Sequence, residues 1–273
     1  RDVEIAAVVV AVDGAAWLPE VLGEDELDDG RTVAQVAVGQ VEFADVVVLD
    51  RPEATLLAVL RRLAARARIT TGVAQLELAL AHLEPNARRG RSDHPHGPLL
   101  AGQPPLEPHG QVQLFEFHAR RPFHPDRLHT ALDVLLEGVV RARGRLWLAS
   151  RNHHVMWLET AGGGLHVESA GKWLAAMTAS EVAYVDADRR VFADLLWEYR
   201  FGDRHTSITV LACGASPVAV DDTLRAALLT DDELAAPDEW AGYADPFGDW
   251  HTDPCTETTD GVTARGTGEE GTR

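Results

Sequence analysis

The sequence predicts two folded units in series: an α/β unit with a parallel sheet, followed by an α+β unit with a mostly antiparallel sheet. Three observations support this. In the first part, continuous apolar runs alternate with segments of helical periodicity, a pattern typical of buried parallel strands joined by helices. A stretch rich in Pro, Gly, Arg and His then lacks any periodicity. In the second part, strand-like segments and a predicted hairpin dominate.

The first unit begins with VEIAAVVVAVD at residues 3–13, which predicts a strand buried on both faces. The segment 52–67 predicts a helix that presents one apolar face. Leu56, Val59, Leu60 and Leu63 form that face. The other expected elements are a helix over 31–44 with core residues Val33, Val36, Val38, Val41 and Phe43, a buried strand over 45–50, a short strand near Ile69 and a helix over 73–83.

The second unit begins with the strand-like run VQLFEFHA and a helix over 124–139, with Leu128, Ala131, Leu132 and Leu135 as its apolar stripe. The remaining expected elements are a strand over 145–150, a hairpin over 155–171 that turns at Gly162, Gly163 and Gly164, a strand over 204–213 and a helix over 218–229. We therefore expect one α/β domain over 1–87, a linker over 88–110, an α+β domain over 111–251 and a disordered tail over 252–273.

Composition excludes several classes of protein. The formal net charge of −18 repels phosphate backbones, so we expect no direct nucleic-acid partner. No apolar run approaches the length of a membrane span, and no signal peptide is visible, so we expect a cytoplasmic protein without a membrane partner. Two cysteines fit a reducing compartment. Because the chain starts at Arg1 and structure-like sequence follows at once, we expect it to be part of a longer chain.

The corner that follows the second strand is the first candidate site. Ligands in open α/β sheets lie beyond the carboxyl ends of the strands, where Asp13 and the segment Asp50-Arg51-Pro52-Glu53 fall. Asp50 can equally act as a helix N-cap, with Glu53 reaching back as in a capping box and Pro52 in the first turn. The two roles are compatible, and the residues alone favour the cap.

The 12 histidines offer the second candidate site. His118, His124 and His129 lie close in sequence, and neutral imidazole is a common zinc ligand, so this trio is the most testable metal site. Surface or capping roles explain the same residues. His94, His96, His153 and His154 are further candidates in the linker and before a strand. Asp203, Arg204 and His205 stand at a strand entrance, where a turn with a local ion pair explains them as well as a site does.

Several stretches together resemble the CobW family of P-loop GTPases. QVEFADVVVLDRPE resembles the segment that leads into the family's guanine-reading Asn-Lys-x-Asp, and LEPNARRG resembles a later turn. FHARRPFHPDRLHTALD, VVRARGRLWLASR, AGGGLHVESAGKW and FGDRHTSITVL resemble successive pieces of the CobW C-terminal domain. The ending ALLTDDELAAPDEWAGYADPFGDW resembles actinobacterial members, one branch of which is linked to zinc limitation and to recruiting a ribosome-hibernation factor.

The resemblance implies the C-terminal half of a GTPase-like domain, then a CobW C-terminal domain. It also implies GTP with Mg²⁺ and zinc as the cofactors of the complete family, and zinc delivery to client proteins. The chain departs from the family pattern. No G-x-x-x-x-G-K-[ST] loop occurs, and Asp50, Arg51 and Glu53 stand where Asn, Lys and Asp are expected. We therefore expect weak or absent guanine selectivity and no GTP hydrolysis by these residues.

Two functions follow as hypotheses. The first is a CobW-like metal-homeostasis protein of the zinc chaperone or insertase class, whose partners are zinc enzymes. The second is an adaptor with a degenerate nucleotide site that recruits a ribosome-associated hibernation factor under zinc limitation. The proteins recovered with this chain under zinc starvation discriminate between the two.

Overall fold

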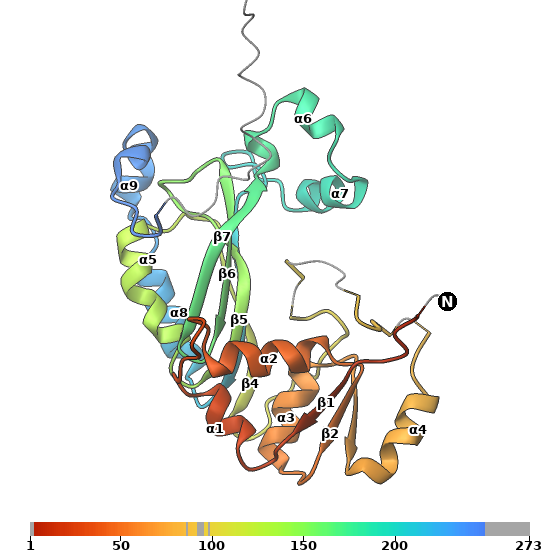
Figure 1. The fold of residues 1–273 in the computed structure, drawn as a ribbon. Coiled ribbons are helices and arrows are strands. Elements are labelled where there is room, and N and C mark those ends of the chain that lie inside the picture. The colour runs from red at the N-terminus through yellow and green to blue at the C-terminus, as the bar shows by residue number, and fades with distance from the viewer. Residues whose placement is uncertain (1–2, 86, 92–95, 98, 249–273) are drawn as a thin grey trace, which may run out of the picture.

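The computed structural model describes residues 3–85, 87–91, 96–97 and 99–248. The expected disordered tail over 252–273 lies outside the described residues. The predicted fold class is confirmed: a three-stranded parallel sheet with helices comes first, and a five-stranded antiparallel sheet follows (Figure 1). No helix in the described part of the chain is long and apolar enough to cross a membrane.

The parallel sheet has the strand order β1-β2-β3. Its elements are β1 (Val9–Val12), α1 (Trp17–Val21), α2 (Val33–Phe43), β2 (Val46–Leu49), α3 (Ala54–Leu63), β3 (Arg68–Thr71), η1 (Val73–Gln75) and α4 (Leu76–Ala81). Thr32 starts α2 with a reciprocal capping box to Gln35, and β2 is buried along its whole length. The predicted face of α3 is confirmed, because all four of its apolar residues are buried.

The expectation for the first strand is wrong in extent and burial. Only Val9–Val12 is a strand, and its burial is partial, with Val9 41% exposed. The reason is its position: β1 pairs with β2 alone and forms an edge of the parallel sheet within the described residues. Fewer residues of α2 are buried than predicted. Val38 and Val41 are buried, whereas Val33 is only half-buried.

The antiparallel sheet has the order β4-β8-β5-β6-β7. Its strands are β4 (Val112–Ala119), β5 (Val139–Leu146), β6 (His154–Ala161), β7 (Gly164–Lys172) and β8 (Thr206–Cys213). The helices of this part are α5 (Pro125–Ala131), η2 (Leu132–Leu135), η3 (Leu174–Ala176), α6 (Ala179–Ala183), α7 (Ala187–Leu195), α8 (Pro217–Ala226), α9 (Asp231–Ala235) and η4 (Pro237–Gly242). The predicted hairpin and the apolar stripe of α5 and η2 are confirmed.

One strand of this sheet is displaced from its prediction. We expected a helix up to residue 139 and a strand over 145–150, but β5 runs from Val139 to Leu146. Gly138, with φ of 68°, separates the helical segment from the strand. The pattern VVRARGRL concealed the strand because Arg141 and Arg143 occupy positions that face the interior, where apolar residues are expected.

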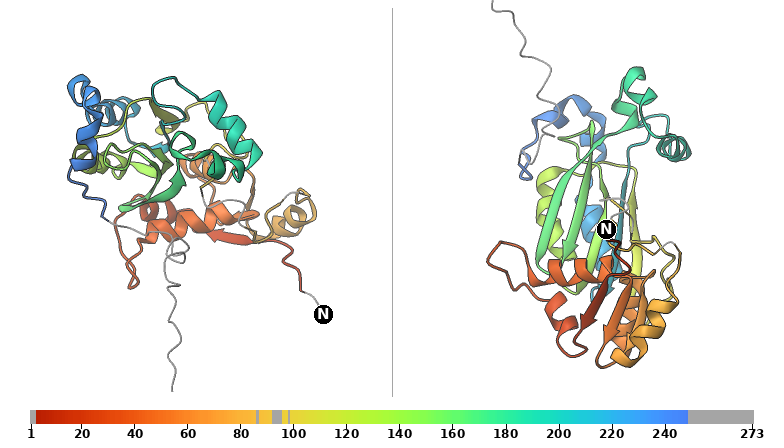
Figure 2. Two further views of the ribbon diagram at one scale, coloured as in Figure 1. Left: turned by 90° about the horizontal axis from the view of Figure 1, so that it is seen from above. Right: turned by 45° about the vertical axis from the view of Figure 1, so that its right-hand side comes forward.

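The two sheets share one hydrophobic core. Buried residues of α2 and α3 pack in the same cluster as Val112, Leu114, Val140 and Leu211 of the antiparallel sheet. Leu99, in the segment expected as a linker, is also buried in this cluster. In both Figure 1 and Figure 2, α6 and α7 lie at the end of the antiparallel sheet opposite the parallel sheet. The first unit is therefore packed onto the second. Helix α7 projects from the opposite end of the second unit.

Candidate functional site

The corner after β2 places both of its carboxylates on backbone amides. Asp50 Oδ1 accepts a hydrogen bond from the amide of Gly14, which follows β1, at 2.7 Å. Glu53 is the N-cap of α3, and its Oε2 accepts from the amide of Leu56 at 2.8 Å. The prediction that Asp50 caps the helix is therefore wrong. Glu53 takes that position because the helix begins at Ala54, two residues beyond Pro52.

These hydrogen bonds fix the charge of the corner. The amide of Gly14 holds the pKa of Asp50 below its ordinary value, and the amide of Leu56 does the same for Glu53. The Arg51 guanidinium lies 3.3 Å from Asp50 Oδ2 and is 70% exposed. The corner is thus ionised and solvated, and its carboxylates already serve local structure.

Close packing at the corner depends on a glycine. A Cβ added to Gly14 would lie 2.1 Å from the carbonyl oxygen of Arg51. Asp13 uses its Oδ1 to accept from the amides of Ala15 and Ala16, at the start of the segment that leads to α1. The predicted site residues Asp13, Asp50, Arg51 and Glu53 therefore follow the carboxyl ends of β1 and β2, and the hydrogen bond from Gly14 to Asp50 joins the two loops.

The histidine trio is not gathered into one ligand set. His118 lies on β4, with its Nε2 3.4 Å from Glu116. His124 precedes α5 and stacks on Tyr243, with ring centroids 4.6 Å apart, whereas His129 meets Phe247 edge-on. Across the described residues, no three His, Cys, Asp or Glu side chains are grouped so as to hold a metal ion. His124 and His129 instead hold the C-terminal segment against α5.

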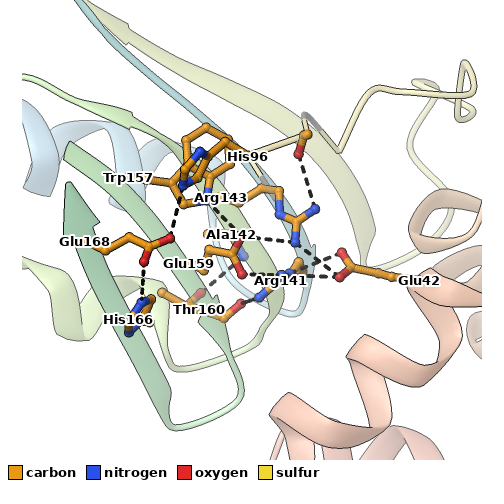
Figure 3. A network of polar contacts seen from close by, with 11 residues as sticks. Glu42, His96, Arg141, Ala142, Arg143, Trp157, Glu159, Thr160, His166 and Glu168 are labelled. Atoms are coloured by element: carbon orange, nitrogen blue, oxygen red, sulfur yellow. Dashed lines mark hydrogen bonds and ion pairs between the residues drawn. The ribbon is translucent and has the colours of Figure 1, made fainter. Parts of the chain in front are cut away.

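The other histidine candidates have structural partners as well. His96 Nε2 lies 3.0 Å from Glu168, and His166 Nε2 lies 3.3 Å from the other oxygen of that carboxylate (Figure 3). His154 starts β6, and burial lowers its pKa. His153 accepts a hydrogen bond at its carbonyl from the amide of Trp173. His94 lies outside the described residues.

The strand entrance before β8 is a turn without the expected ion pair. Asp203 accepts hydrogen bonds from the amides of Leu174 and Ala175, both at 2.9 Å. Arg204 donates instead to the carbonyls of Asn152 and Phe201. The predicted local pair fails because the backbone of η3 provides a better set of donors for Asp203.

A buried charge network joins the two sheets, and no sequence pattern predicted it. Glu42 at the end of α2 accepts from Arg141 Nε at 3.2 Å and from Arg143 at 3.3 Å (Figure 3). Glu159 on β6 closes the network with contacts of 2.7 Å to Arg141 and 3.2 Å to Arg143. Two cations thus face two anions between α2 and the antiparallel sheet.

The carboxylates outweigh burial for Arg141 but not for Arg143, whose pKa is lowered by burial first and by the neighbouring Arg141. Burial opposes charge on Arg141, but Glu42 and Glu159 outweigh it, so the pKa of the guanidinium is raised. Burial likewise opposes charge on Glu159, and the two arginines overcome it to lower the pKa of the carboxyl. Alternation along β5 places these arginines on one face, and the partner in α2, about 100 residues away in sequence, completes the set.

A second feature that the sequence did not locate is an exposed apolar surface around α7. It consists of Tyr184, Val191, Leu195, Trp197 and Tyr199, each at least half exposed. Within α7 only Ala193 is buried. Large exposed apolar side chains that lie this close in sequence are typical of interaction surfaces. We call these five residues the α7 surface.

Comparison with known proteins adds the family context. Residues 112–228 match the cobalamin synthesis protein cobW C-terminal domain. A zinc chaperone of Mycobacterium tuberculosis, Rv0106, is 68% identical over 259 residues, which are 95% of this chain and 65% of that protein. The chain therefore spans just under two thirds of the length of this relative.

Two further similarities have lower sequence identity. The zinc-regulated GTPase metalloprotein activator 1 of Dictyostelium discoideum is 24% identical over 283 residues, covering 89% of this chain and 56% of that protein. The crystal structure of Zn(II)-bound YjiA GTPase from E. coli aligns with a TM-score of 0.37 at 13% identity, covering 82% of this chain and 61% of that one. The matched segment runs from β4 through α8 and includes β5 to β8, so the similarity to the cobW C-terminal domain covers all five strands of the antiparallel sheet.

Proposed function

We propose that this chain is part of a zinc chaperone of the CobW type, which hands zinc to client proteins. The observation that carries the proposal is the 68% identity, over nearly the whole chain, to a relative named as a zinc chaperone. The cobW C-terminal domain over 112–228 supports it. In this proposal, the domain of residues 1–87 is the GTPase-like part and residues 111–251 form the part that contacts clients.

Nucleotide chemistry is proposed for the complete protein and not for these residues alone. GTP hydrolysis needs groups that neutralise the charge developing on the transferred phosphoryl group, and no phosphate loop occurs among the 273 residues. The corner carboxylates are engaged with Gly14 and Leu56. We therefore expect neither hydrolysis nor guanine selectivity from this chain.

Calorimetric titration of this chain with GTP, GDP and ATP tests that expectation. The expected result is no difference between guanine and adenine nucleotides. Micromolar binding that prefers guanine would overturn the proposed role of the corner while leaving the zinc proposal standing.

Zinc is the cargo in this proposal, and no described residue set is assigned to it. Ligation by His118, His124 and His129 remains a prediction, supported only by their nearness in sequence and the shared position of His124 and His129 at α5. Competition with a chelating dye tests it: loss of zinc binding in His124→Ala, with Tyr243→Phe as the control that keeps the stacked ring, would support the trio. Equal zinc binding by the unaltered protein, His124→Ala and Tyr243→Phe would rule out the trio as the zinc site.

The altered corner after β2 favours a second candidate, an adaptor that recruits a ribosome-associated hibernation factor under zinc limitation. Both functions need a protein-binding surface, but an adaptor needs no nucleotide switch, and the corner offers none of the expected base-reading groups. The exposed aromatic residues Tyr184, Trp197 and Tyr199, which flank α7 in the sequence, suit either kind of partner.

Affinity purification from zinc-starved cells that encode the protein separates the candidates. Zinc enzymes recovered with the protein support the chaperone, whereas ribosomal or hibernation proteins support the adaptor. The matched variants are Leu195→Asp, on the α7 surface, and Val218→Asp, an equally simple change at an exposed residue of α8. We expect only Leu195→Asp to lose the partner. If both variants retain it, the α7 surface is not the contact.

A further inference from the structure

A cavity of about 530 Å³ lies between α7 and the antiparallel sheet. Its aromatic lining comes from Trp157 of β6, Trp173 before η3 and Phe192 of α7. Arg145 of β5 and His205 before β8 also line it. The volume is in the range of small-molecule sites, which are mostly apolar with a few placed polar groups.

Arg145 is the third arginine on one face of β5, and it alone of the three has no carboxylate partner. Arg141 and Arg143 share Glu42 and Glu159, whereas the cross-strand neighbour of Arg145 is Trp157. The Arg145 guanidinium makes no hydrogen bond or ion pair with the described residues and lies over the Phe192 ring, 5.3 Å from its centroid. Burial lowers its pKa and nearby Arg189 adds to this, with Asp203 opposing in part. A desolvated cation in this state favours an anionic ligand.

Two further groups extend the polar side of the cavity. Trp173 is buried and its Nε1–H has no hydrogen-bond partner within the described part of the chain. His205 donates from Nδ1 to the carbonyl of Asp203 at 2.8 Å, and burial lowers its pKa, so the neutral ring keeps Nε2 as an acceptor. The cavity thus lacks an acceptor for Trp173 and a counter-charge for Arg145.

The acidic residues that line the cavity do not neutralise Arg145. Both oxygens of Asp203 accept from backbone amides of η3. Asp186 is the N-cap of α7 and accepts from the amide of Asp188, and Asp188 itself is exposed. The second cation of the lining, Arg189, donates to the carbonyl of Lys172.

We propose that this cavity binds an aromatic carboxylate, with its carboxylate on Arg145 and its ring among Trp157, Trp173 and Phe192. The planar guanidinium fork matches a carboxylate with two parallel hydrogen bonds. Aromatic walls favour a flat ligand body. This site is separate from the corner after β2 and from His118, His124 and His129, whereas His96 lies in its lining.

Binding of 2-naphthoate by the full chain tests the proposal, measured by calorimetry and by quenching of tryptophan fluorescence. We expect saturable binding that is about tenfold or more weaker for neutral 2-naphthamide and for Arg145→Gln, because each removes a charge-assisted hydrogen bond. Arg145→Lys should retain part of the affinity, since it keeps the charge and loses the fork. Arg225→Gln, on the outer face of α8, is the matched control and should bind as the unaltered protein does.

The contradicting outcomes are equally specific. Absence of saturable 2-naphthoate binding, equal binding of the amide, or unchanged binding by Arg145→Gln would each overturn the site. Tighter binding of 2-naphthyl phosphate than of 2-naphthoate would overturn the assignment of a carboxylate headgroup. Should Arg145→Gln not fold, Arg145→Lys and the amide comparison still decide the matter.

Discussion

At the scale of single residues, local geometry at the corner after β2 decides what its side chains can do. Asp50 and Glu53 are exposed, yet each accepts a backbone hydrogen bond that a bound base would have to displace or share. Gly14 is what allows the Arg51 backbone to approach. The corner is therefore better described as a structural joint between β1, β2 and α3 than as an open reader.

Gly14→Ala tests this description. The added Cβ would lie 2.1 Å from a backbone oxygen, so the joint must shift. We expect the free energy of unfolding in urea to fall by about 1–3 kcal/mol, the usual cost of overpacking. Gly39→Ala is the control, because a Cβ there in the middle of α2 meets nothing within 4 Å. The helix should gain about 0.5–1 kcal/mol. Equal effects of the two substitutions would show that the corner tolerates the side chain.

At the scale of elements, short helices in the C-terminal part are held by charged caps. Glu233 closes a capping box with Thr230 at the start of α9 and receives two hydrogen bonds from Arg127 of α5, at 2.9 and 2.6 Å. The pKa of Glu233 is lowered to about 2. The largest cause is the hydrogen bond from Arg127, which outweighs the opposing effect of burial. The segment after α8 is thereby fixed to α5.

The sign of the pH dependence follows from that pKa. The carboxyl is ionised in the folded protein down to about pH 2, whereas the ordinary glutamate pKa of 4.5 applies to the unfolded chain. Its stabilising contribution is therefore complete above about pH 4.5 and is lost as pH falls towards 2. We expect Glu233→Gln to flatten the fall in unfolding free energy over this window. Glu239→Gln, at an exposed position in η4, is the control. An unchanged pH profile for Glu233→Gln would contradict the assignment.

Sequence patterns predicted those elements whose apolar spacing is regular. The faces of α3 and of α5 with η2, the buried strand β2 and the hairpin of β6 and β7 were all predicted in this way. Patterns failed where polar residues face inward or apolar residues face outward. Arg141 and Arg143 concealed β5, and α7 was missed because its apolar residues are exposed and lie among charges. The contact of Glu42 with β5 spans about 100 residues, and no local pattern predicts such a pairing.

At the scale of the whole molecule, the parallel and antiparallel sheets form one packed body. They share an apolar cluster, and the network of Glu42, Arg141, Arg143 and Glu159 lies at their junction. Removal of one member leaves the others buried without full compensation. The charge network therefore couples the stability of the first unit to that of the second.

Arg141→Ala measures this coupling. It leaves Glu42 and Glu159 facing only Arg143, so we expect a loss of about 3–5 kcal/mol in the free energy of unfolding. Arg31→Ala, which removes an exposed ion pair with Asp29, should change stability little. The double variant Glu42→Gln with Arg141→Met should recover part of the loss, because it removes opposite charges together. If Arg141→Ala and Arg31→Ala lower the free energy of unfolding by the same amount, the network has no special role.

The proposed function requires that client proteins receive zinc from this protein. The most direct measurement is the zinc content of zinc enzymes purified from zinc-limited cells, by mass spectrometry of the metal, with the gene present, deleted or restored. We predict that occupancy falls on deletion and returns with the unaltered gene or with Val218→Asp, but not with Leu195→Asp. Zinc occupancy that is the same in all of these cells would contradict the proposal that this protein delivers zinc.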